Sequence, residues 1–391
     1  MGSASRLSYN RKQPGRYNVS LKTLSMPAAR ITTPDDPALG ALCSRLADLS
    51  PSLEAADAWP AQQLRLCGEA GVFEWFIALE HGGQGWSEVD VLRGYVKLAA
   101  ACLTTTFVIT QRTGAMQRLA AGASDAAKHE LLPDLLAGRT FATVGISHLT
   151  TSRQHMARPV LRAEERDGGF VLDGYSPWVT GAEFAQHIAL GATLADGRQI
   201  LVALPTNLPG VRIDRAPQLV GLSASRTGPV HLDAVFVSHK WLLAGPVHEV
   251  MKQGLGARTG GSQTSALAIG LASAAIAFLE QQSVARSDLA EPGTALAQER
   301  DALLEAMLQL TGDDISQDHT VCVVNSNELR VRSNSLALRA TQAALAAAKG
   351  AGYVAGHPAG RWCKEALFFL VWSCPAPVLQ ANLCELAGLA E

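Results

Sequence analysis

Near the end of the chain stand Lys349-Gly350-Ala351-Gly352-Tyr353, His357-Pro358 and the apolar run Ala366-Leu367-Phe368-Phe369-Leu370-Val371-Trp372-Ser373-Cys374-Pro375. Glycine adopts backbone conformations that other residues avoid, so the first part predicts a tight turn. The apolar run, with prolines at 375 and 377, is shorter than the ~18–20 apolar residues that a membrane span requires. The same holds for the small-residue stretch Thr264–Leu279. We expect both stretches to be core helices and predict no membrane span.

The composition of the whole chain is that of an ordinary globular protein. Its 391 residues are too many for one simple core and suit two or three packed subdomains. Hydrophobic residues make up 48% and charged residues 17%, which leaves apolar surface for subunit contacts. A net charge of −2 gives no reason to expect nucleic-acid binding. The 7 cysteines lack metal-type spacing and indicate reduced thiols in a cytoplasmic protein without a metal site.

The first residues form a basic segment. Six lysines and arginines precede the first acidic residue, Asp35. The segment lacks the apolar core of about 7–15 residues that a secretory signal requires. Residues 1–35 are therefore predicted to be a disordered basic tail, with an organelle-targeting peptide or a true start at Met26 as alternatives.

Three blocks with different residue patterns follow the tail. Residues 36–140 carry helical three-and-four spacing, residues 141–240 carry short β-type runs separated by glycine turns, and residues 241–391 are helical again. This order predicts an α+β protein with an N-terminal α-helical domain, a central antiparallel β-barrel or sandwich, and a C-terminal four-helix bundle. Helices are expected over Ala38–Leu49, Pro60–Ala70, Val89–Thr104, Asp125–Leu136, Pro246–Arg286, Gly293–Thr311, Asn325–Gly350 and Pro358–Leu386, and strands over Arg139–Ser147, Val160–Glu164, Gly169–Asp173, His187–Thr193, Gln199–Pro205, Val211–Arg215 and Pro229–Ser238.

Several motifs stand in a fixed order along these blocks: Leu79-Glu80-His81-Gly82-Gly83-Gln84-Gly85-Trp86, Val144-Gly145-Ile146-Ser147-His148-Leu149, Asp173-Gly174-Tyr175-Ser176-Pro177-Trp178-Val179-Thr180-Gly181 and Val220-Gly221-Leu222-Ser223-Ala224-Ser225-Arg226-Thr227. Together with the segment that ends at Pro375, they resemble elements of the acyl-CoA dehydrogenase family. The resemblance extends from about residue 40 to 375. It implies the acyl-CoA dehydrogenase fold and an FAD held between the β-domain and the C-terminal bundle.

The same resemblance implies roles for individual residues. Trp178 would pack against the flavin ring, and the Thr180 hydroxyl, two residues on along the strand and on the same face, would bind the ring's edge. Ser147 would supply a second hydroxyl. Gly350 and Gly352 would allow close approach to the cofactor pyrophosphate of a neighbouring subunit in a homodimer or homotetramer. A tryptophan in a strand is also often a core residue, and that alternative stays open for Trp178.

The chain departs from the family at the catalytic position. Family members carry a glutamate that removes a substrate proton, and counting from the glycine turn places Ser373 there. A serine hydroxyl is no base by itself, and proton abstraction needs a base within hydrogen-bond reach. His357, His148 and Glu365 are the nearest candidates by sequence.

Three functions therefore remain open from the sequence. The first is a flavin-dependent oxidoreductase that acts on an acyl-CoA or acyl-carrier-protein thioester, with hydride transfer to FAD. The second is a flavin-dependent monooxygenase on the same fold, which needs no carbon-acid base. The third is a non-catalytic homologue that has lost the cofactor. It is favoured by Ala346-Ala347-Ala348-Lys349-Gly350, which stands where the resemblance implies a Gln-x-x-Gly-Gly turn at the cofactor pyrophosphate.

Overall fold

A computed structural model describes residues 29–150, 159–254, 261–311 and 325–389. Most of the predicted basic tail, residues 1–28, lies outside the described residues. The chain is ordered earlier than the predicted tail boundary at residue 35. Ile31 is fully buried, and its backbone N–H donates to Ala70 O at 3.0 Å.

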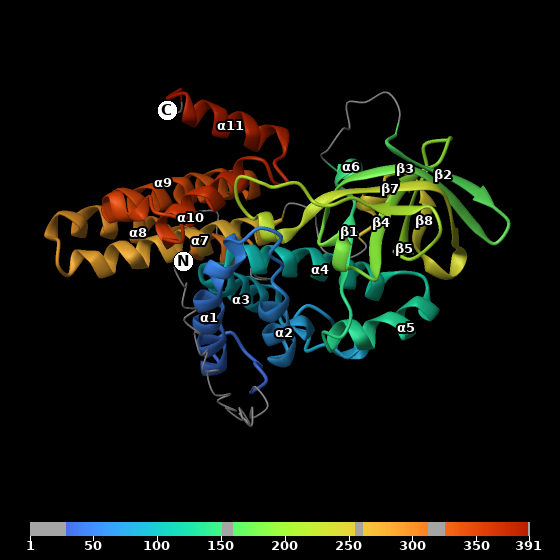
Figure 1. The fold of residues 1–391 in the computed structure, drawn as a ribbon, viewed down its shortest axis with the longest axis horizontal. Helices are drawn as coiled ribbons and strands as arrows, with labels where there is room; N and C mark the ends of the chain where they lie inside the picture. The colour runs from blue at the N-terminus through green and yellow to red at the C-terminus, as the bar shows by residue number, and fades with distance from the viewer. Residues whose placement is uncertain (1–28, 151–158, 255–260, 312–324, 390–391) are drawn as a thin grey trace, which may run out of the picture.

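The N-terminal block is a helical layer below the sheet and the bundle (Figure 1). Its helices are α1 (Pro37–Leu49), α2 (Ala61–Glu69), α3 (Glu88–Ala101), α4 (Leu103–Ala121) and α5 (Asp125–Leu136), with the short 3-10 helix η1 (Ser50–Glu54) after α1. Side-chain caps fix where two of them begin. The carboxylate of Asp36 accepts from Ala38 N at 2.9 Å, and Ser87 Oγ accepts from Asp90 N at 3.1 Å.

Helix α4 was not predicted beyond Thr104. It runs through the middle of the molecule, between the sheet and the C-terminal helices (Figure 1). Most of its residues are buried, including Thr105, Arg112 and Thr113. A helix that is covered on nearly all sides has no polar stripe, so the spacing rule that identifies amphipathic helices gives no signal here.

The central block is one connected sheet of eight strands. The strands are β1 (Ala142–Gly145), β2 (Leu161–Arg166), β3 (Gly169–Thr180), β4 (His187–Thr193), β5 (Gln199–Pro205), β6 (Val211–Ile213), β7 (Thr227–Ser238) and β8 (Leu242–Val247). Their order is β6-β7-β3-β2-β4-β5-β8, with β1 paired to β4. Most pairings are antiparallel, as predicted, but β4 pairs in parallel with both β1 and β2.

The C-terminal block is helical and confirms the predicted fold class. It contains α7 (Ser262–Ser283), α8 (Ala290–Gln309), α9 (Ser326–Gly352), α10 (Pro358–Ala366) and α11 (Ala376–Leu386). The predicted single helix Pro358–Leu386 is wrong in the middle: the 3-10 helix η9 (Leu367–Leu370) follows α10, and Pro375 begins a separate α11. A proline lacks the N–H that a continuous helix needs, which explains the break.

Helix α7 is long and apolar enough to cross a membrane by length and composition, and 67% of its most apolar window is buried inside the protein. It packs between α3, α8 and α9. Among the described helices it is the one that meets this test. Its burial makes it the core of the bundle.

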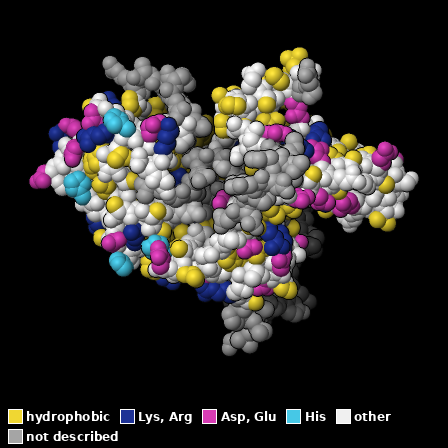
Figure 2. Space-filling view, turned by 180° about the vertical axis from the view of Figure 1, so that it is seen from behind, with side chains coloured by type: hydrophobic (Ala, Val, Ile, Leu, Met, Phe, Trp, Pro, Cys, Tyr) yellow, Lys and Arg dark blue, Asp and Glu magenta, His cyan; other side chains and the backbone are white. Residues whose placement is uncertain are grey.

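Helix α11 extends away from the rest of the bundle (Figure 1). Val378 and Asn382 face the protein and are buried, whereas Leu379, Leu383 and Leu386 are exposed. Figure 2, which views the molecule from behind, shows apolar side chains on this projecting part. The exposed leucines repeat at helical spacing and form one apolar stripe.

Candidate functional site

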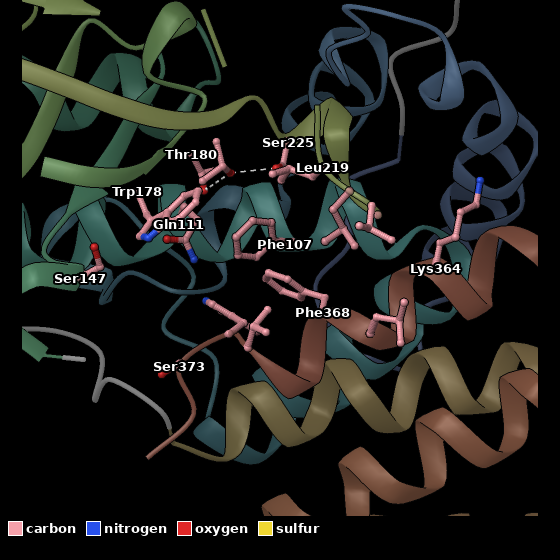
Figure 3. Close-up of a pocket in the computed structure, with 17 residues that line it drawn as sticks. Phe107, Gln111, Ser147, Trp178, Thr180, Leu219, Ser225, Lys364, Phe368 and Ser373 are labelled. Carbon is pink, nitrogen blue, oxygen red and sulfur yellow. Dashed lines mark hydrogen bonds between the residues drawn. The ribbon is translucent and has the colours of Figure 1, made fainter. Parts of the chain in front are cut away.

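A cleft of about 470 Å³ lies between the sheet and the C-terminal helices. Its volume is within the range of small-molecule and cofactor pockets. Strands β3 and β7 and the segment before β7 form one wall, helix α4 forms the back, and α10 with η9 forms the opposite wall (Figure 3). The lining residues are Phe107, Gln111, Ser147, Trp178, Thr180, Leu219, Val220, Gly221, Leu222, Ser225, Thr227, Lys364, Leu367, Phe368, Val371, Trp372 and Ser373.

The sheet wall brings together three residues that the sequence singled out. Trp178, Thr180 and Ser147 all line the cleft, although Ser147 comes from the start of the short helix α6 (Ser147–Thr150) and not from β3. The Trp178 side chain is 50% exposed, so it is not the core residue of the alternative interpretation. An indole that presents a free face to a cleft can stack on a planar ring.

Ser147 has a hydroxyl without a partner. Its Oγ is buried and makes no hydrogen bond to the described residues. Buried polar groups are nearly always hydrogen-bonded in native proteins, so an orphaned hydroxyl in a cleft wall indicates a missing ligand or water.

Hydroxyls also connect β3 to β7. Thr180 Oγ1 lies 2.9 Å from Thr227 Oγ1, which lies 2.8 Å from Ser225 Oγ (Figure 3). The pairing of β3 with β7 places Thr180 directly opposite Thr227. All three side chains are buried and line the cleft.

The helical wall is aromatic. Phe368 stacks on Trp372 with ring centroids 5.0 Å apart, and Phe107 of α4 meets both rings edge-on, at 4.7 Å and 5.1 Å. Two side chains of α9 hold this segment by its backbone. Arg330 Nη2 donates to Trp372 O at 2.8 Å, and Asn334 Nδ2 donates to Phe369 O at 3.1 Å.

Ser373 lies at the end of this wall and lines the cleft. Its φ of 46° is in the left-handed region that side chains other than glycine adopt reluctantly. Neither Asp, Glu nor His is among the described residues that line the cleft, and Lys364 is the one ionisable side chain there. The described lining therefore offers neither a carboxylate nor an imidazole as the base for a carbon acid.

The other base candidates lie elsewhere. His357 is the N-cap of α10: its Nδ1 accepts from Ala359 N at 3.2 Å, and its ring meets Phe278 edge-on. His148 is buried with Nε2 2.8 Å from Gly191 O, and burial lowers its pKa. Neither histidine is brought to the cleft.

Glu365 lines a smaller chamber of about 200 Å³ on the other side of the segment Leu219–Leu222. Its carboxylate accepts from Thr104 Oγ1 at 3.1 Å. Burial raises its pKa to about 7, against a smaller opposing effect of Arg361. The carboxyl group is therefore partly protonated at neutral pH and separated from the cleft by a layer of backbone.

Gly350 and Gly352 lie at the end of α9, away from the cleft lining. A Cβ on Gly350 would meet open space, whereas a Cβ on Gly352 would come within 2.7 Å of the Ala348 Cβ. Gly352 thus serves local packing in this chain. A contact of either glycine with a neighbouring subunit's cofactor stays a prediction.

Four residues of the site escaped the sequence analysis. Phe107 and Gln111 are on the unpredicted helix α4, so no pattern pointed to them. Ser225 and Thr227 stood in a recognised segment without an assigned role. Only the pairing of β7 with β3 would have identified them, because it places Thr227 beside Thr180.

Comparisons with known proteins show what the chain is similar to. The family model for the acyl-CoA dehydrogenase N-terminal domain matches residues 41–139. Among curated proteins, the chain is 26% identical to the probable acyl-CoA dehydrogenase YngJ of Bacillus subtilis over 59% of this chain and 62% of that protein. It is 28% identical to the oxygenase component of the FADH(2)-dependent resorcinol hydroxylase of Rhizobium sp. (strain MTP-10005) over 49% of this chain and 44% of that protein. These matches span less than two thirds of the curated relatives.

Solved structures give the same fold over nearly the full length. The glutaryl-coenzyme A dehydrogenase complex with glutaryl-CoA superimposes with a TM-score of 0.71 at 18% identity, covering 91% of this chain and 96% of that chain. At that identity, the likeness is one of fold.

Proposed function

We propose, for this chain of the acyl-CoA dehydrogenase family, a flavin-dependent oxidoreductase that works as an oxygenase on reduced flavin and molecular oxygen. One observation carries the proposal: the described cleft lining holds no carboxylate or imidazole. Ser373 lines the cleft, and the resemblance, counted along the chain, implies that it replaces the family's glutamate. A dehydrogenase must remove a proton next to the thioester carbonyl, for which a positioned base contributes about 10²–10⁴ in rate. Oxygen transfer to a substrate does not depend on that base.

The sheet wall fits a flavin. Trp178 offers a half-exposed ring for stacking, Thr180 offers a buried hydroxyl, and Ser147 offers one without a partner. FAD is the flavin we propose, because it is the cofactor that the family resemblance implies. Bound reduced flavin would supply two electrons to O₂, so that one oxygen atom enters the substrate and the other leaves as water.

The chain's own residues would bind the substrate and exclude water. The ring cluster of Phe107, Phe368 and Trp372 makes the helical wall apolar. An enclosed apolar site protects reactive species from hydrolysis and side reactions. Gln111 of α4 adds an uncharged hydrogen-bonding group to the cleft lining (Figure 3).

A thioester dehydrogenase is the second candidate. The match to a probable acyl-CoA dehydrogenase of Bacillus subtilis favours it, as does the fold. Its substrate would be an acyl-CoA or an acyl-carrier-protein thioester, and its base would have to come from outside the described cleft lining. A homologue without cofactor is the third candidate, and the altered cofactor elements of the C-terminal block support it.

We also propose a cytoplasmic homodimer or homotetramer. The exposed stripe of Leu379, Leu383 and Leu386 on α11 is a surface that a second copy would cover. We further propose that residues 36–140, 141–240 and 241–391 form the three domains of the chain.

Flavin loading, one reaction under argon and one reaction with O₂ test the function. Purified protein incubated with FAD should retain a visible flavin spectrum after desalting. Acyl thioesters under argon should leave the spectrum unbleached, whereas chemically reduced, flavin-loaded protein should consume O₂ and release less H₂O₂ when an accepted substrate is present. Bleaching by a thioester under argon would make the protein a dehydrogenase. A protein that retains no flavin would be the non-catalytic homologue.

A further inference from the structure

Thr180, Thr227 and Ser225 form a row of three hydroxyls along the sheet wall. The oxygen-to-oxygen distances are 2.9 Å and 2.8 Å, both within the range of good O–H···O hydrogen bonds. All three side chains are buried, and all line the cleft. In each pair either oxygen is able to be the donor.

A row of this kind has two internal arrangements. In one, Ser225 donates to Thr227, Thr227 donates to Thr180, and the Thr180 proton is left to donate into the cleft. In the other, every bond points the opposite way, and Thr180 presents a lone pair to the cleft. Each hydroxyl provides one donor and two acceptor lone pairs, so both arrangements use the same atoms with no proton gained or lost.

We propose that this row is a hydrogen-bond relay of reversible direction, which presents Thr180 as a donor to one redox state of a bound flavin and as an acceptor to the other. The inference rests on the proposed function. The ring nitrogen at the reactive edge of a flavin is an acceptor when oxidised and carries a hydrogen when reduced. A row that reverses by rotating three O–H bonds satisfies the buried Thr180 hydroxyl in both states, and bonds in a row strengthen one another.

Arg226 is the positioning residue of this row. It stands between Ser225 and Thr227 with a left-handed φ of 50°, which turns the two hydroxyls toward each other. Its guanidinium donates to Asp57 at 2.7 Å and to Glu183 at 2.8 Å, and the side chain is 6% exposed. Its carbonyl accepts from Gly181 N at 3.0 Å, next to Thr180. Arg226 thereby links both ends of the row to Asp57 of the N-terminal block and to Glu183 of the central block.

The experiment replaces the central hydroxyl and measures FAD binding in both redox states. Thr227→Val keeps the shape and removes the hydroxyl, and Thr227→Ser keeps the hydroxyl. Thr341→Val removes a buried hydroxyl of α9 that does not line the cleft. Dissociation constants for oxidised FAD come from fluorescence titration. Those for reduced FAD follow from the midpoint potential of the bound flavin, and thermal unfolding confirms that each variant is folded.

Thr227→Val should weaken FAD binding about 3- to 10-fold in both states. Water replaces the missing hydroxyl in the open cleft, but bound flavin excludes that water, so Thr180 lacks its second hydrogen-bond partner in each complex. The midpoint potential should then stay unchanged, and Thr227→Ser should restore the affinity. A tenfold loss in one state alone would move the potential of this two-electron couple by about 30 mV and would overturn reversibility. Equal affinities of Thr227→Val and Thr341→Val would overturn the relay altogether. Wild-type protein that binds no FAD would instead refute the proposed function.

Discussion

The two walls of the cleft have different chemistry. The sheet wall carries hydroxyls and a half-exposed indole at Ser147, Trp178 and Thr180, and the helical wall carries the rings of Phe368 and Trp372. Within the described lining, the sheet wall keeps the groups that hold a flavin in the family resemblance, whereas the helical wall lacks the family's acid. Under the proposed function, cofactor binding and proton abstraction would belong to separate segments, so one can change while the other remains.

An acidic residue, Glu365, does lie near the helical wall, although it does not line the cleft. Glu365 of α10 lies eight positions before Ser373 in the sequence, but it faces the small chamber together with Glu54 and Arg361. The backbone of Leu219–Leu222 lies between the two spaces. A Cβ on Gly221 would come within 2.5 Å of Lys364 O, which shows how tightly this segment packs on α10.

The strongest prediction about the helical side concerns Glu365. Its pKa is raised by burial to about 7, above the value of about 4.3 in an unfolded chain, so protonation favours the folded state. The stabilisation is complete below about pH 4.3 and is lost as the pH rises through about 7, a change of about 3 kcal/mol. Glu365→Gln should remove this dependence. Urea unfolding at pH 5, 6, 7 and 8 measures the free energy of unfolding. Between pH 5 and pH 8 that of the variant should rise by about 3 kcal/mol relative to the wild type.

Glu54→Gln is the control, because Glu54 lines the same chamber but forms an exposed ion pair with Lys364. It should leave the slope of stability against pH nearly as in the wild type. A difference between Glu365→Gln and wild type that is the same at every pH would contradict a pKa near 7 for the Glu365 carboxyl.

The next prediction concerns the sheet wall. Trp178→Ala should weaken FAD binding about 5- to 100-fold, because stacking of an aromatic side chain on a planar base contributes about 1–3 kcal/mol. The half-exposed indole makes a small contribution to folding, so the midpoint of unfolding should hardly move. Fluorescence titration with FAD measures the first effect and thermal unfolding the second.

Phe236→Ala provides the matched control. Phe236 is a comparably exposed aromatic residue of β7, at 48%, and it does not line the cleft. Its loss should leave FAD affinity unchanged. Similar losses in both variants would show that the sheet wall has no special role for Trp178.

Part of the sheet wall could be predicted from the sequence, because side chains alternate between the two faces of a strand. Side chains two apart share a face, so Trp178 and Thr180 were expected together, and both line the cleft. The predicted bounds of β4, β5 and α5 agree with the structure, since turn residues delimit them. The family model and the solved structures confirm the fold class. The cofactor roles of these residues stay predictions.

The rest of the site depends on contacts that no local pattern encodes. Phe107 reaches the cleft from α4, which is buried on most sides and has no amphipathic signal. Thr227 meets Thr180 only through the register of β3 with β7, which a bulge shifts between Ser176 and Val179. Sequence distance alone could not place the base candidates: His357 caps α10, and Glu365 lines the smaller chamber.

The smallest expected effect tests whether Ser373 acts in the chemistry at all. Its φ of 46° costs a serine about 1–2 kcal/mol, whereas glycine adopts it freely. Glycine loses more entropy on folding, by about 0.4–1 kcal/mol, so Ser373→Gly should stabilise the protein by a net of about 0.5–1 kcal/mol. Ser373→Ala removes the hydroxyl but keeps the Cβ, so it should leave stability nearly unchanged. Both variants should turn over substrate like the wild type, because a hydroxyl without a base beside it takes no proton. If both lose activity to the same extent while their stabilities differ, the Ser373 hydroxyl takes part in the reaction, and the helical wall is catalytic after all.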